Sequence, residues 1–127
     1  QYLSRSTKGV FRGLHYQKYP YLVTKLINVI EGSIVDFGIC VDKNSEFYGI
    51  SFRVEIDETT PFFLLVPSGF AHGFYTKSDM SMVLSSMNNG YQSEYEECYS
   101  YKLIQNFFYI SDQIIISDKD KQAKRVL

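Results

Sequence analysis

Lys25-Leu-Ile-Asn-Val-Ile30, Glu31-Gly32-Ser33 and Ile34-Val-Asp-Phe-Gly-Ile-Cys-Val41 follow one another in the chain. Both outer stretches are apolar and rich in β-branched residues, which fit the pleated surface of a sheet. Gly32 gives the short connection the backbone freedom that a tight turn needs. The segment therefore predicts a strand, a turn and a second strand, paired as a β-hairpin.

Further short strands are predicted on both sides of this segment. Clusters of turn-forming residues separate them, as in Asp42-Lys-Asn-Ser45 and Pro67-Ser-Gly69. The first hundred residues contain no long stretch with the 3.6-residue period of an amphipathic helix. Many short strands at this spacing are typical of a sandwich or barrel, so the chain is predicted to be all-β. The additional strands are expected at Val10–His15, Gly49–Glu55, Pro61–Val66, Gly73–Thr76 and Ser81–Met87.

The end of the chain has a different character. Ser117-Asp-Lys-Asp-Lys-Gln-Ala-Lys-Arg125 is polar and predicts the beginning of a short helix. Ser117 is suited to be its N-cap, which would place Asp120 at the third helical position. We therefore expect a short helical segment after the β domain.

Composition limits the classes of function. The 127 residues form one expected domain, 1–127, with 45% apolar residues and a net charge of −1 from 13 Lys+Arg and 14 Asp+Glu. This balance gives no reason to expect nucleic acid or a membrane surface as a partner. Cys40 and Cys98 stand in no C-x-x-C spacing, which argues against a disulfide framework or structural zinc and favours the cytoplasm. No apolar run reaches the ~18 residues of a membrane span.

The chain has two histidines, His15 in Arg12-Gly-Leu-His15 and His72 in Pro67-Ser-Gly69-Phe-Ala-His72. Histidine in a β domain is often a hydrogen-bonded structural residue, but its imidazole is also well suited to move a proton near neutral pH. On a regular strand Arg12 and His15 would point to opposite faces. A bulge at Gly13 would bring both side chains to one site.

The Pro-x-Gly-x-x-His spacing at Pro67, Gly69 and His72 resembles the second motif of the cupin superfamily, whose fold is a jelly-roll barrel, the double-stranded β-helix. Metal-binding cupins usually add a His-x-His pair and a carboxylate, because a divalent ion needs three or four converging ligands. Here the first motif offers only His15. We therefore expect an acid/base site without a metal or another cofactor.

Several motifs together resemble the dTDP-4-dehydrorhamnose 3,5-epimerase family, and they occur in order over most of the chain. The resemblance implies a homodimeric, metal-free cupin that inverts C3, C5 or both beside the 4-keto group of a nucleotide-diphosphate 6-deoxy sugar, for surface polysaccharide synthesis. The matching stretches are Gly9-Val-Phe-Arg-Gly-Leu-His-Tyr-Gln17, Lys25-Leu26, Gly32-Ser-Ile-Val-Asp-Phe37, Val41-Asp-Lys-Asn-Ser45, Pro67-x-Gly-Phe-Ala-His-Gly-Phe74 and Ser117-Asp-Lys-Asp120.

The resemblance also implies roles for individual residues. His15 takes the place of the general base, and Asp120 that of the carboxylate that orients its imidazole. Lys25 stands where an ammonium group would stabilise the enolate formed beside the ketone. Arg12 stands where a guanidinium would bind the diphosphate, and Gln17 from the same motif is expected to contact the substrate.

The remaining expected site residues lie later in the chain. Asp36 and His72 correspond to pocket positions, as a partner carboxylate and a substrate-contacting histidine. Ser85 stands where the family has the tyrosine that returns a proton from the face opposite the base. A serine hydroxyl is far less acidic than a phenol, whose pKa is ~10. Either Tyr91 or Tyr75 is expected to donate the proton instead; otherwise the proton returns on the original face.

Two further observations leave alternatives open. Only eleven residues precede Arg12, fewer than in the family, so the chain is expected to lack an N-terminal segment that supplies strands exchanged between subunits. Ser85 and the short start also fit an epimerase with an altered outcome, or a sugar-nucleotide-binding cupin without catalytic activity.

Overall fold

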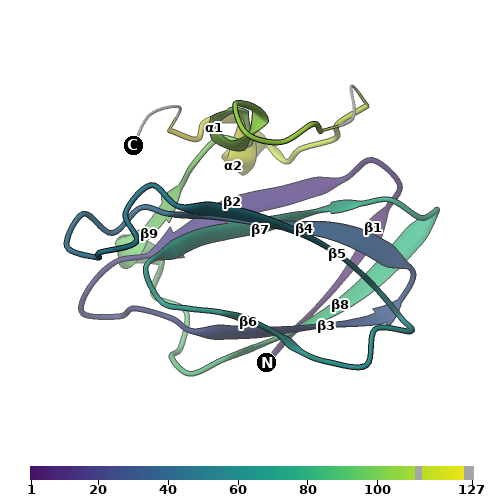
Figure 1. The fold of residues 1–127 in the computed structure, drawn as a ribbon, viewed down its shortest axis with the longest axis horizontal. Coiled ribbons are helices and arrows are strands. Elements are labelled where there is room, and N and C mark those ends of the chain that lie inside the picture. Colours follow the sequence, from purple (N-terminus) through teal and green to yellow (C-terminus); the bar gives the residue numbers. More distant parts are fainter. Residues whose placement is uncertain (111–112, 125–127) are drawn as a thin grey trace.

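In residues 1–110 and 113–124, which the computed structural model describes, nine strands form two antiparallel sheets stacked face to face (Figure 1). The four-stranded sheet has the order β1-β8-β3-β6, and its strands are β1 (Tyr2–Thr7), β8 (Met80–Met87), β3 (Lys25–Glu31) and β6 (Leu64–Val66). The five-stranded sheet has the order β5-β4-β7-β2-β9, and its strands are β5 (Ser51–Asp57), β4 (Ser33–Cys40), β7 (Phe70–Thr76), β2 (Phe11–Gln17) and β9 (Glu96–Cys98). The all-β prediction is confirmed.

The predicted hairpin at residues 25–41 is wrong in its pairing, although both strands exist. β3 pairs with β6 and β8, whereas β4 pairs with β5 and β7, so the chain crosses between sheets at Gly32. Gly32 has a φ of +84°, and a Cβ there would collide with the Met80 carbonyl oxygen. β4 is buried over seven of its eight residues because it is a central strand covered on both faces, and this burial favours the second sheet over pairing with β3.

The helical prediction at the end of the chain is confirmed. Helix α2 (Asp118–Lys121) has Ser117 as its N-cap, whose Oγ accepts a hydrogen bond from the Asp120 N–H at 3.2 Å. A short helix α1 (Lys102–Gln105) and a 3₁₀ turn η1 (Ser93–Tyr95) were not expected. Figure 1 shows α1 and α2 above the outer face of the five-stranded sheet. No helix among the described residues is long and apolar enough to cross a membrane.

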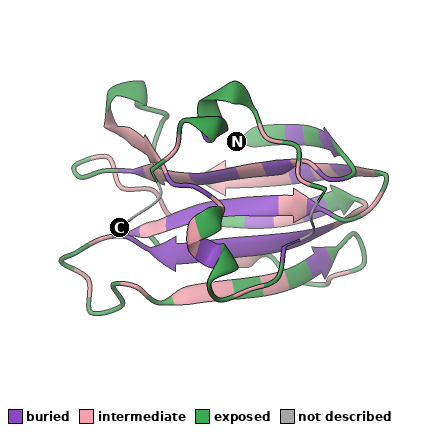
Figure 2. Ribbon diagram, turned by 90° about the horizontal axis from the view of Figure 1, so that it is seen from above, coloured by how far each residue is buried: buried purple, intermediate pink, exposed green. Residues whose placement is uncertain are grey.

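The five-stranded sheet separates two apolar clusters, and its central strands are largely buried (Figure 2). The inner cluster lies between the sheets, and the outer cluster lies beneath the helices. Because side chains alternate along β7, Phe74 belongs to the inner cluster and Tyr75 packs against the outer one. The inner cluster contains Ile27, Val29, Ile34, Ile56, Val66, Phe74 and Val83. Residues on the inner face can therefore line a shared cavity.

Candidate functional site

A cavity of about 540 Å³ lies between the two sheets. One wall comes from the five-stranded sheet, and the opposite wall comes from the four-stranded sheet. Residues from α2 and from the segment after β8 complete the rim. The first wall carries Arg12, His15, Gln17, His72 and Phe74; the second carries Tyr2, Ser4, Lys25, Ser85 and Met87; the rim includes Tyr91, Lys119 and Asp120.

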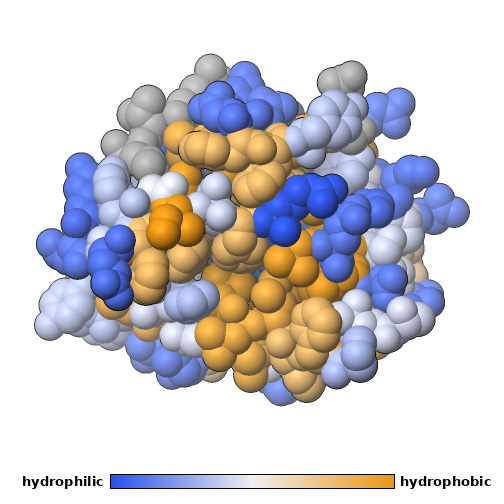
Figure 3. All heavy atoms as spheres, in the orientation of Figure 1, coloured by the Kyte–Doolittle hydropathy of each residue, from blue (hydrophilic) through white to orange (hydrophobic). Residues whose placement is uncertain are grey.

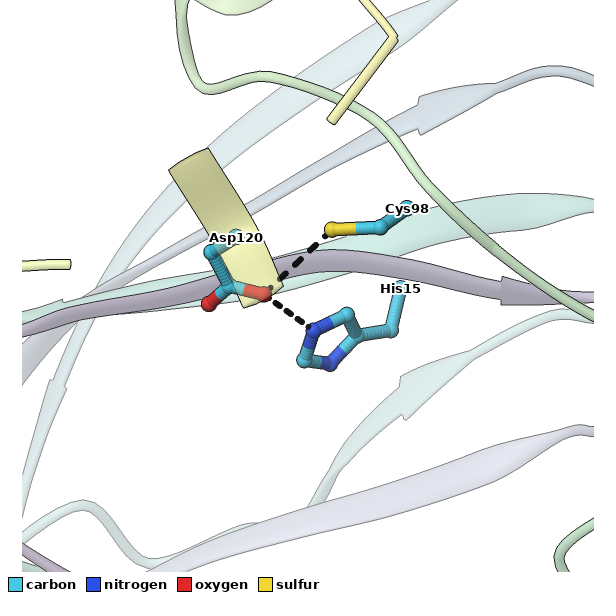
Figure 4. Close-up of side chains that lie close together, drawn as sticks. All are labelled: His15, Cys98 and Asp120. Atoms are coloured by element: carbon cyan, nitrogen blue, oxygen red, sulfur yellow. Dashed lines mark hydrogen bonds and ion pairs between the residues drawn. The ribbon is translucent and has the colours of Figure 1, made fainter. Parts of the chain in front are cut away.

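The Asp120 carboxylate connects the C-terminal helix to β2 and β9 (Figure 4). Its Oδ1 lies 2.8 Å from His15 Nε2 and 3.3 Å from the Cys98 thiol, and its Oδ2 accepts the Gly13 N–H at 3.2 Å. Asp120 is 6% exposed. The expected His15–Asp120 pair is therefore present, and backbone and thiol donors hold the carboxylate in addition.

A bulge in β2, one of the two arrangements that the sequence left open, brings Arg12 and His15 to the same cavity. The register between β2 and β7 shifts between Arg12 and His15. Gly13 has a φ of +117°, and a Cβ there would lie 2.6 Å from the His72 carbonyl oxygen. Glycine is therefore needed both for the backbone conformation and for the close approach of the two strands.

The electrostatics of Asp120 favour its ionised form. Burial alone would raise its pKa, but the His15 hydrogen bond and charge, with the Gly13 and Cys98 hydrogen bonds, outweigh burial and lower it. Oδ1 of the ionised carboxylate therefore accepts a hydrogen bond from the Nε2–H of His15. Among the described residues no hydrogen bond to the other ring nitrogen, Nδ1, is present, and Figure 4 shows it on the side of the ring away from Asp120. Nδ1 is therefore the atom that can accept a proton.

A second histidine–aspartate pair lies beside the first. His72 is directly opposite His15 in the β2–β7 register, and its Nε2 lies 2.8 Å from both Asp36 carboxylate oxygens. Asp36 is fully buried and lies behind His72 rather than in the cavity lining. Burial raises the pKa of Asp36, opposed by His72 and by the charge of Lys25. Burial likewise lowers the pKa of Lys25, opposed by the charges of Asp36 and Glu96.

The structure places the other expected residues in different settings. Arg12 lines the cavity, with Nε donating to Ser6 Oγ at 2.8 Å. The Gln17 amide lines it too, but it bonds the carbonyls of Tyr21 and Gly90 and the N–H of Gln92. This arrangement holds the segment that carries Tyr91. Ser85 and Tyr91 also line the cavity, whereas Tyr75, considered as an alternative proton donor, faces the outer cluster.

Sequence reasoning missed Cys98, because β9 is three residues long and gives no strand pattern. β9 pairs with β2 so that Cys98 lies directly opposite His15. His15, Cys98 and Asp120 could in principle hold a metal ion, since their ligand atoms lie within 4.8 Å of one another. Metal binding requires a thiolate. Burial, with the nearby Asp120 carboxylate, raises the pKa of Cys98 to about 12, which favours a thiol that donates to Asp120.

We predict that Cys98 reacts slowly with iodoacetamide at pH 8. A thiol of pKa about 12 has on the order of a thousandfold less thiolate at this pH than a free cysteine. The Asp120→Asn variant should react several-fold faster, because it lacks the carboxylate charge. Mass spectrometry of the modified peptide gives the rates, and Cys98→Ser controls for labelling at Cys40. Reaction of the unsubstituted chain at the rate of a free thiol would contradict the hydrogen-bonded thiol.

Comparison with known proteins identifies the family of the chain. The family model for dTDP-4-dehydrorhamnose 3,5-epimerase matches residues 1–127. An enzyme of that name from Shigella flexneri is 37% identical over 124 residues, covering 96% of this chain and 68% of the relative. One from Methanothermobacter thermautotrophicus is 34% identical over 125 residues, covering 95% and 67%. The chain thus spans about two thirds of the length of these relatives.

Solved structures of the same family have the same fold as this chain. The enzyme from Bacillus anthracis, with TDP and PPi bound, superposes with a TM-score of 0.90 at 30% identity, covering 98% of this chain and 73% of the other. The Legionella pneumophila enzyme in complex with dTDP-4-keto-L-rhamnose has a TM-score of 0.88 at 33% identity, covering 97% and 66%. The predicted cupin-type jelly roll is thereby confirmed. The fold, the two histidine–aspartate pairs and the family match over residues 1–127 agree. The chain belongs to the dTDP-4-dehydrorhamnose 3,5-epimerase family of isomerases.

Proposed function

We propose that this chain is an epimerase that inverts C3, C5 or both, next to the 4-keto group of a nucleotide-diphosphate 4-keto-6-deoxy sugar, in the synthesis of surface polysaccharide. The observation that carries this proposal is the His15–Asp120 pair on one cavity wall, with Lys25 on the other. The dTDP-sugar bound to the Legionella relative supports the substrate class. A cavity of about 540 Å³ fits a ligand of sugar size with its nucleotide toward the mouth.

In the first step His15 takes a proton from the carbon beside the ketone. Asp120 fixes the ring through Nε2, so Nδ1 accepts the proton and the resulting imidazolium is stabilised by the adjacent carboxylate. The side chain of His15 is 33% exposed, which leaves it accessible to a ligand, whereas that of Asp120 is 5% exposed. A buried anion behind an accessible imidazole is the arrangement that a general base requires.

Lys25 stabilises the enolate oxygen that forms when the proton leaves. Its ammonium group lies on β3, on the wall opposite His15. The pKa of Lys25 is lowered because burial makes its charged form less stable. A developing negative charge on the substrate would offset this loss of stability most strongly in the transition state, where the enolate forms.

Other side chains position the substrate. Arg12 is held by Ser6 Oγ and by the Arg5 carbonyl, which leaves a guanidinium edge to bind diphosphate oxygens. His72 contacts the sugar, with Asp36 fixing its ring from behind. Ser85 contributes a small hydroxyl to the same cavity. No metal or cofactor is assigned to the reaction.

We further propose that the protein is a homodimer and acts in the cytoplasm. The outer face of the four-stranded sheet carries exposed apolar residues, since Leu26 opposes Leu65 across β3 and β6 and Leu3 opposes Leu84 across β1 and β8. Leu3, Leu26 and Leu65 are 57%, 39% and 56% exposed. Figure 3 shows apolar side chains gathered in its lower part, where β6 lies in Figure 1. Contiguous apolar surface of this kind favours association of two copies.

The proposal of a cytoplasmic location is supported by the cysteines. Cys40 and Cys98 both carry free thiols, which suit a reducing compartment.

We predict a dimer across the micromolar range in sedimentation experiments. Replacing Leu26 and Leu65 by Glu should give a folded monomer, because the like negative charges of the two subunits would meet at the proposed interface and repel each other. Phe47→Glu, at an exposed turn position away from this face, is the control and should remain dimeric. A monomeric unsubstituted protein, or a dimer that survives the double substitution, would contradict this interface.

We predict that His15→Ala abolishes deuterium wash-in at C3 and C5 of dTDP-4-keto-6-deoxyglucose in heavy water. The expected loss is at least ~10²-fold, the usual contribution of a general base. NMR and mass spectrometry of the recovered sugar measure the exchange, and thermal unfolding with ligand titration checks that the variant folds and binds. Equal exchange in both proteins would refute the base assignment. Binding without exchange by the unsubstituted protein would instead favour a non-catalytic sugar-nucleotide-binding cupin.

A further inference from the structure

Inversion at a carbon needs a proton donor on the face opposite the base. His15 lies on the five-stranded wall, so the donor must reach the substrate from the four-stranded wall. Lys25 on that wall serves the enolate oxygen in the proposed function. Ser85, also on that wall, is too weak an acid to return the proton.

Tyr2 is the phenol on the four-stranded wall of the cavity among the described residues. It lies in β1, directly opposite Ser85 in the β1–β8 register. Alternate residues of a strand share one face, so Tyr2 is on the same face of β1 as Ser4 and Ser6. Because Ser4 and Ser6 are buried against the interior, the Tyr2 side chain leaves the strand on the cavity side. Both Tyr2 and Ser85 line the cavity.

Tyr91, which the sequence favoured, lies in a different position. It follows β8 in the segment held by Gln17, and the Lys119 ammonium lies 5.8 Å from its ring centroid. Lys119 is in α2, one residue before the Asp120 that holds His15. Tyr91 is thus associated with the elements that carry the base, rather than with the opposite wall.

We propose that Tyr2 is the proton donor that completes inversion, with its phenol replacing an acid at position 85. This inference rests on the proposed epimerase function. Directly opposed residues of antiparallel strands have Cβ atoms ~5 Å apart, so a phenol from either position enters the same part of the cavity. The small Ser85 side chain leaves that space to the Tyr2 ring.

Exchange of protons with water returns both side chains to their starting protonation states. His15 Nδ1 accepts the proton as the C–H bond breaks, and the electron pair moves into the enolate at Lys25. The enolate carbon then takes the Tyr2 hydroxyl proton on its opposite face, so a new C–H bond forms and a phenolate remains. Tyr2 is 58% exposed, so water can reprotonate it, and the His15 imidazolium returns its proton to water.

Tyr2→Phe tests this role, because it removes the hydroxyl and keeps the ring. The variant should still wash deuterium into the substrate, since His15 can exchange its proton and return deuterium to the original face. Net inversion should fall at least ~10²-fold relative to exchange. Adding Ser85→Tyr to Tyr2→Phe should restore inversion, and Tyr48→Phe, in the turn before β5, is the matched control that should change neither rate.

The outcomes separate this inference from the proposed function. An unsubstituted protein that neither exchanges nor inverts refutes the epimerase function itself. An unsubstituted protein that does both, with an unchanged ratio in Tyr2→Phe, overturns the assignment of Tyr2 alone. Loss of inversion in Tyr91→Phe but not in Tyr2→Phe would also overturn it and give the role to Tyr91. Rescue by Ser85→Tyr excludes a folding defect as the cause of the loss.

Discussion

The site depends on the hydrogen bonds that the Asp120 carboxylate accepts. This carboxylate receives hydrogen bonds from an imidazole, a backbone N–H and a thiol, which come from β2 and β9, while it sits itself in the first turn of α2. Burying an unpaired carboxylate is costly, whereas one with three donors is stable and keeps its charge. The short C-terminal helix is thereby fixed against the sheet, and the same contacts set the orientation of the His15 ring.

The two walls of the cavity carry different kinds of functional side chain. The five-stranded sheet supplies two histidines in adjacent strands, each held by its own aspartate. The four-stranded sheet supplies the ammonium of Lys25 and the phenol of Tyr2 on either side of β8. In the proposed mechanism, a sugar ring bound between these walls presents one face to His15 and the other to Tyr2. The stacking of the two sheets would then place the proposed base and the proposed donor on opposite faces of the substrate.

Much of this arrangement could be predicted from the sequence, and the exceptions have physical reasons. The Ser117 cap depends on local residues and the pairing of His15 with Asp120 on a family pattern, and both were predictable; the bulge at Gly13 was one of two arrangements that the sequence left open. The crossing between sheets at Gly32 was not predictable, because a tight glycine turn serves equally for a hairpin and for such a crossing. Cys98 and the proposed donor Tyr2 were missed because their positions depend on strand register: Cys98 lies opposite His15, and Tyr2 lies opposite Ser85. Register between distant strands leaves no local signal.

A double-mutant cycle on His15 and Asp120 tests the central claim most directly, with the rate of net epimerisation as the readout. If Asp120 acts only by holding and stabilising the His15 imidazole, the two residues work as one unit and their effects are not additive. His15→Ala combined with Asp120→Asn should then be no slower, within about threefold, than His15→Ala alone. A combined loss equal to the product of the two single losses would contradict the account, because it would show that the two side chains act independently.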